Sequence, residues 1–140
     1  MEHGEPEEFL ATLDPADRDE LVARGRPRRW PAGASLLLEG ERAPSVILVV
    51  SGRVKAFSLT EHGEEIVLAL RGPGAILGEL SAVSGQEASA SVAALEPVAA
   101  IVVPVPVFLE FLRTHGRAAT ALLRLVTSRL RDADRKRVEY

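Results

Sequence analysis

The chain has 140 residues, 46% of them hydrophobic, which is enough for one domain with a core and too few for two. Its formal net charge of −3 gives the chain as a whole no electrostatic attraction to nucleic acid. It has no cysteine, which excludes disulfides, thiol catalysis and cysteine-bound iron–sulfur clusters, and its three isolated histidines form no metal-binding pattern. We therefore expect a protein that is not an enzyme. The lack of a signal peptide and of a long apolar run predicts a cytoplasmic protein that does not enter the membrane.

The first segment, residues 1–25, carries eight acidic and two basic side chains. Its apolar residues are spaced as on one or two short amphipathic helices, and Asp14-Pro15 fits a helix cap and first turn. We interpret this segment as a solvated helical lid over one end of the following domain, because runs of charge are usually solvated. A surface for a partner protein is the alternative.

The middle segment, residues 26–104, alternates short apolar runs with glycines, beginning with the sequence from Trp30 to Gly33. Runs of this length and spacing predict an all-β barrel or jelly roll. The runs are Ser35–Leu38, Val46–Val50, Val54–Leu59, Ile66–Leu70, Val92–Leu95 and Val98–Val103.

Alternation within these runs predicts which side chains face inward. Val46–Val50 is apolar at every position, which is typical of a strand buried on both faces. Thr60–Gly63 has the composition of a hairpin turn between two strands. We expect the apolar side chains of both strands of this hairpin to belong to the barrel core: Phe57, Leu59, Ile66, Leu68 and Leu70.

The stretch Gly72–Ser81 has the pattern of a phosphate-binding segment. A Gly-Pro-Gly turn ends one strand, and Gly78 then opens a short helix whose first free amides could face an anion. Glu79 cannot neutralise an anion, but its carboxylate can accept hydrogen bonds from hydroxyls such as those of a ribose. Amides for a phosphate beside a carboxylate for a sugar suggest a nucleotide. The alternative is that tight barrel corners require these glycines.

The order Gly78-Glu79-Leu80-Ser81, a short spacer and then Ser89-Ala90 resembles the cyclic-nucleotide-binding domain of the Crp/Fnr transcription regulators. The resemblance covers nearly the whole chain. It implies a mainly β fold, a double-stranded β-helix or jelly-roll barrel with short N-terminal helices and a long C-terminal helix. It also implies a set of ligand-binding residues: Gly78, Glu79, Leu80, Ser81, Ala88, Ser89 and Ala90.

The sequence departs from this family at Ala88. The family usually has at this position an arginine that binds the cyclic phosphate, and losing that charge-assisted contact costs roughly 1.5–3 kcal/mol. The resemblance makes a small anionic ligand, cyclic AMP or cyclic GMP, the candidate ligand. Because the arginine is missing, we expect this ligand to bind weakly. No other cofactor is indicated.

The last segment, residues 105–140, is predicted to be helical, because prolines at 104 and 106 end the last strand and begin a helix that reaches His115-Gly116. The final helix has two apolar stripes, of which one can face the barrel and the other a second copy of the chain. The resemblance implies that this helix pairs two subunits, whereas a single helix lying on its own domain is the alternative. The first stripe, our candidate dimer seam, is Ala119, Leu123, Val126, Leu130 and Ala133, and the second is Ala118, Leu122 and Leu125.

The same helix carries mixed charges, including Arg124, Arg129 and Arg131, which we interpret as a solvated, ion-paired surface. In the resembled family a helix-turn-helix domain follows this helix, so we expect DNA contact only through such a domain, absent from this chain. The expected function is the ligand-sensing domain of a Crp/Fnr-type regulator, a homodimer that relays ligand state through the last helix. The alternative is a stand-alone, degenerate barrel that binds no nucleotide and serves protein–protein interaction.

Overall fold

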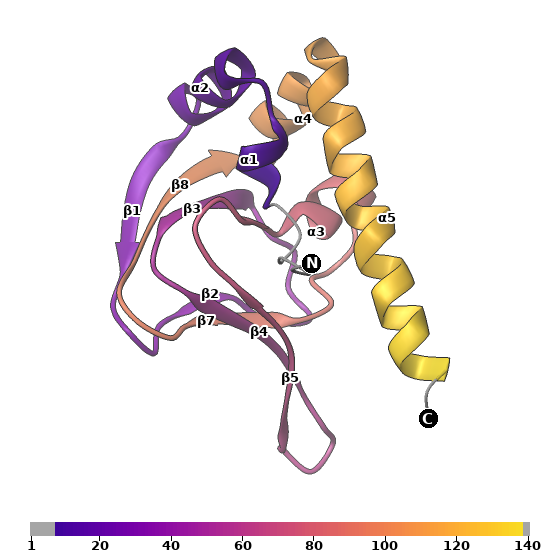
Figure 1. Cartoon of the computed structure of the whole chain (residues 1–140). Helices are drawn as coiled ribbons and strands as arrows, with labels where there is room; N and C mark the ends of the chain where they lie inside the picture. The colour runs from indigo at the N-terminus through magenta and orange to yellow at the C-terminus, as the bar shows by residue number, and fades with distance from the viewer. Residues whose placement is uncertain (1–7, 139–140) are drawn as a thin grey trace, which may run out of the picture.

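The computed structural model describes residues 8–138, with side chains as far as Asp132, and is built on two antiparallel four-stranded sheets (Figure 1). The first sheet contains, in spatial order, β1 (Arg26–Trp30), β8 (Val98–Pro104), β3 (Ser45–Ser51) and β6 (Ile76–Leu77). The second contains β2 (Ser35–Leu37), β7 (Ser91–Ala94), β4 (Val54–Leu59) and β5 (Glu65–Arg71). The predicted mainly β jelly-roll architecture is confirmed.

β3 is one of the two inner strands of the first sheet and is buried on both faces from Val46 to Val49. Val46 and Leu48 pack against the helices, whereas Ile47 and Val49 point into the space between the two sheets. This is why the sequence of β3 is continuously apolar rather than alternating. The prediction fails only at Val50, which is 54% exposed.

The β4–β5 hairpin differs from the prediction. Four of the expected core residues are about half exposed and do not belong to the barrel core: Leu59 at 58%, Ile66 at 51%, Leu68 at 46% and Leu70 at 56%. The hairpin projects from the barrel, so its distal part has no opposite sheet to cover it (Figure 1). In addition, the pairing register shifts between Ala56 and Phe57, and such an irregularity changes which side chains face inward.

β1 was not predicted, because arginines at 26, 28 and 29 leave it without the run of apolar residues by which the other strands were identified. It pairs only with β8 and its first four residues are exposed, so it is the edge of its sheet. Charged residues and a proline, here Pro27, are typical of edge strands that avoid pairing with other chains.

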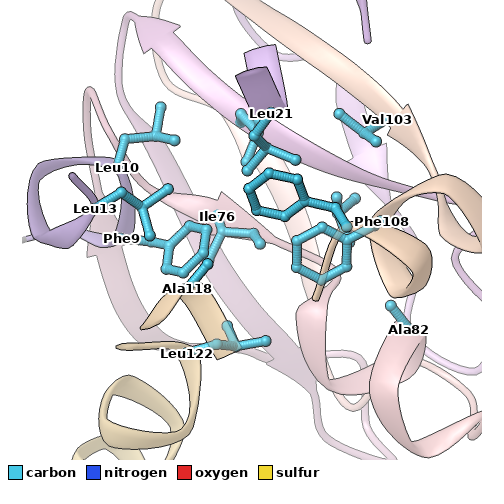
Figure 2. Close-up of a cluster of buried hydrophobic side chains, with 13 residues drawn as sticks. Phe9, Leu10, Leu13, Leu21, Ile76, Ala82, Val103, Phe108, Ala118 and Leu122 are labelled. Carbon is cyan, nitrogen blue, oxygen red and sulfur yellow. The ribbon is translucent and has the colours of Figure 1, made fainter. Parts of the chain in front are cut away.

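Five helices accompany the sheets in residues 8–138 (Figure 1): α1 (Phe9–Thr12), α2 (Pro15–Ala23), α3 (Glu79–Ser84), α4 (Val105–Thr114) and α5 (Gly116–Val138). The N-terminal helices are not merely a solvated lid, because Phe9 and Leu21 are fully buried. Figure 2 shows Phe9, Leu21 and Phe108 in one cluster that joins these helices to the sheet and to α5. Nowhere in residues 8–138 is a helix both long and apolar enough to span a bilayer.

The two stripes of α5 have different environments, as the pattern predicts. Ala118 and Leu122 are buried against the core, whereas Leu123 and Leu130 are 66% and 56% exposed. Ala133, the last residue of the candidate dimer seam, lies outside the side chains that the structure describes. The second stripe therefore attaches α5 to its own domain, whereas in the first stripe Val126 packs partly against the core and Leu123 and Leu130 stay exposed.

Candidate functional site

The predicted phosphate-binding segment adopts the expected turn, strand and helix. A turn at Gly72–Gly74 joins β5 to β6, and α3 begins directly after Gly78. Gly78 has φ +83°, and a Cβ at this residue would lie 3.3 Å from the carbonyl oxygen of Ser45. A side chain at Gly78 would thus be strained by its conformation and crowded by β3, which explains the glycine without reference to a ligand.

Glu79 is the most buried charged residue of the described chain, with 6% of its surface exposed. Its Oε2 accepts a hydrogen bond from Nη1 of Arg129 at 2.7 Å. The second terminal nitrogen of Arg129 lies 3.5 Å from a carboxylate oxygen of Glu8. The carboxylate that we expected to receive a ribose hydroxyl therefore binds α5, and one arginine ties α5 both to the start of α3 and to the residue before α1.

Burial raises the pKa of the Glu79 carboxyl above its ordinary value of about 4.5, and the positive charge of Arg129 offsets this only in part. The folded chain therefore takes up this proton at a higher pH than the unfolded chain does. As the pH falls through this range, the burial cost of the Glu79 charge is relieved and the folded state gains stability relative to a variant without this carboxyl.

We expect Glu79→Gln to change the pH dependence of the free energy of unfolding. As the pH falls from neutral toward the ordinary carboxyl pKa of about 4.5, the unmodified chain should gain stability relative to the variant, as urea unfolding at several pH values can measure. Glu87→Gln, which removes an exposed carboxylate from the neighbouring loop, corrects for the general effect of charge. Parallel pH profiles for the unmodified chain and Glu79→Gln would contradict the raised pKa.

The other predicted ligand residues are held by the chain itself or lie at its surface. The hydroxyl of Ser81 is buried, donates to the carbonyl of Gln86 at 2.6 Å and accepts from the amide of Ala43 at 3.2 Å. Both backbone groups of Ala88 are used, because its amide donates to Glu41 and its carbonyl accepts from Gly40. Exposed or half-buried residues complete the set: Leu80, Ser89 and Ala90.

Two arginines near the site were not predicted. Arg129 was interpreted as part of a solvated helix surface, yet its side chain is only 22% exposed. Its position seven residues after Leu122, on the stripe that faces the core, was a signal that the sequence contained. Arg71, at the end of β5, is half-buried, and four charges act on it: Arg129, Glu8, Glu79 and Asp132. No local pattern indicated this second position.

The jelly roll, the glycine turn and the short helix with a buried glutamate define the class of cyclic-nucleotide-binding barrels. The model of the family described as "Cyclic nucleotide-binding domain" matches residues 27–115, well over half of the chain, and the chain belongs to this family. The resemblance found in the sequence is thereby confirmed.

Relatives of this chain include members of the Crp/Fnr regulators. The Cyclic AMP receptor protein of Thermus thermophilus is 33% identical over 122 residues, which are 87% of this chain and 56% of that protein. The Transcriptional activator protein anr of Pseudomonas aeruginosa is 32% identical over 123 residues, 88% of this chain and 49% of that protein. The crystal structure of the Thermus thermophilus Catabolite Activator Protein superposes with a TM-score of 0.83 at 31% identity, covering 91% of this chain and 60% of that one. The chain thus spans about half the length of these curated relatives.

Proposed function

We propose that this chain is the ligand-sensing domain of a Crp/Fnr-type transcription regulator and that the state of its site is relayed through α5. The observation that supports this most directly is the bond between Glu79 and Arg129, since it joins the predicted ligand segment to the predicted dimer helix. The relatives named as a cyclic AMP receptor and a transcriptional activator support the same class of function.

The proposed relay depends on competition for one carboxylate. A ligand hydroxyl that bonds to Glu79 competes with Arg129 for the same group, because a carboxylate that accepts a new donor must share or lose an old one. When Arg129 shares or loses its bond to Glu79, the attachment of α5 to the start of α3 weakens. The equilibrium between two arrangements of α5 then shifts toward the one to which the ligand binds better. In a homodimer paired along α5, this shift would reach both subunits and any DNA-binding domain attached to them.

Amide hydrogen exchange tests the relay. Cyclic AMP at a saturating concentration should change the exchange protection of α5 in the unmodified chain, and Arg129→Gln should abolish this change. Arg131→Gln, which removes an exposed arginine two residues further along the same helix, is the matched control and should respond like the unmodified chain. Equal responses of both variants would rule out a relay through Arg129.

The rival function, a barrel that binds no nucleotide and serves protein–protein interaction, is favoured by one observation. Ala88 stands where the family's phosphate-binding arginine is expected, so the motif itself provides no cation for a phosphate. Under this function, neither the unmodified chain nor a variant with the arginine restored should bind a cyclic nucleotide, which calorimetry can decide.

A further inference from the structure

Arg71 lies on the face of β5 that is turned into the barrel. It is paired directly with Val54, whose side chain is fully buried, and opposite residues in an antiparallel pair share one face of the sheet. Its neighbour Leu70 is on the other face and is 56% exposed. The end of this strand therefore places an arginine inward and a leucine outward. In most sheets the apolar side chain faces inward and the charged one faces the solvent.

The surroundings of Arg71 are the predicted ligand segment and α5. Arg71 immediately precedes the Gly72–Gly74 turn, and a Cβ at Gly74 would lie only 3.3 Å from the Cβ of Glu8. Glu8 and Glu79 are both bonded to Arg129. Among the residues that the structure describes, Arg71 has no carboxylate oxygen within 4.0 Å, so Arg129 is ion-paired and Arg71 is not.

Within residues 8–132, whose side chains the structure describes, two groups in this cluster lack a partner. Burial lowers the pKa of the Arg71 guanidinium below its ordinary value, and the charge of Arg129 lowers it further, whereas the charges of Glu8, Glu79 and Asp132 raise it. Arg71 is thus a half-buried cation that none of these carboxylates pairs with directly. The Nε–H of Arg129 is buried and has no hydrogen-bond acceptor in the described part of the chain. Buried donors are rarely left unpaired in folded proteins. A bound anion would correct both deficiencies, because it brings a negative charge and acceptor oxygens.

We infer that Arg71 replaces the arginine missing at Ala88, and that it supplies the positive charge for a singly charged anionic ligand bound between β5, the start of α3 and α5. The inference rests on the proposed sensing function and deepens it. Arg71 and Arg129 are the cations of this cluster, and the carboxylates whose charges act on Arg71 are Glu8, Glu79 and Asp132. Without Arg71 a single arginine would face three carboxylates, and the larger negative charge would repel an anion more strongly. A cyclic phosphodiester has one negative charge and is the appropriate probe.

Calorimetry with cyclic AMP on the whole chain tests this inference. Arg71→Gln should weaken binding by about tenfold or more, since a charge-assisted contact is lost. Arg71→Lys, which keeps the charge, should restore most of the affinity. Arg53→Gln is the matched control, because Arg53 is an exposed arginine beside Val54, and it should leave the affinity unchanged. Binding of adenosine, which has no phosphate, should not respond to Arg71→Gln.

Three results would overturn the inference, and the first two separate it from the proposed function. If Arg71→Gln and Arg53→Gln bind cyclic AMP equally well, Arg71 does not hold the anion, although the chain still senses it. If only an Ala88→Arg variant binds and the unmodified chain does not, the site is competent but Arg71 does not compensate. Binding by neither form refutes the inference together with the proposed function. A thermal melt of each variant confirms that it is folded.

Discussion

The Ala88→Arg variant is expected to bind cyclic AMP at least about tenfold more tightly than the unmodified chain, since one charge-assisted contact to phosphate corresponds to one to two decades of affinity. The backbone at Ala88 is already held by Gly40 and Glu41, with N···O distances of 2.9 and 2.8 Å respectively. An arginine there would therefore start from a fixed position beside Ser89. Its guanidinium would add a permanent positive charge and a forked set of N–H donors to a segment that otherwise offers only neutral donors.

Ala88→Gln is the control for this experiment, because glutamine adds length and hydrogen-bonding groups without charge. We expect its affinity to stay close to that of the unmodified chain. Submicromolar binding of cyclic AMP by the unmodified chain would contradict the argument from the missing arginine. The inference about Arg71 adds a second expectation: in the Ala88→Arg background, Arg71→Gln should have a smaller effect than in the unmodified chain, because two cations then share one phosphate.

Replacing Leu123 or Leu130 with aspartate is expected to convert a dimer of this chain into monomers. Both leucines are more than half exposed on α5, and they lie one heptad apart, as on the seam of a two-helix pair. A carboxylate placed in such a seam would be buried without a partner, which costs several kcal/mol. Light scattering coupled to gel filtration at micromolar concentration measures the mass of each form.

Val50→Asp is the matched control for the dimer experiment, since Val50 is 54% exposed on β3 and lies outside α5. If the chain pairs through α5, Val50→Asp should have the same dimer mass in solution as the unmodified chain. A monomer of the unmodified chain at the same concentration would refute pairing through α5. Dimers in both Leu123→Asp and Leu130→Asp would place the interface elsewhere on the molecule.

Local patterns in the sequence determined most of the architecture. β3 is recognisable because its neighbours on both faces are apolar, so every residue from Val46 to Val49 must be apolar too. The start of α3 is recognisable because Gly78 adopts a positive φ that other residues rarely tolerate. The two stripes of α5 follow from helical periodicity alone. Each of these features depends on residues close together in the chain, and each therefore left a local signal.

Tertiary structure alone decided the chemistry of the site. Glu79 and Arg129 are 50 residues apart, and no local pattern states that a charged residue of a long helix will reach a glutamate on another element. The inward position of Arg71 depends on the pairing of β5 with β4, whose register shifts between Ala56 and Phe57. In a strand, a register change of one residue exchanges the inner and outer faces. Alternation could therefore predict that β5 has two faces but not which one carries Arg71 toward the site.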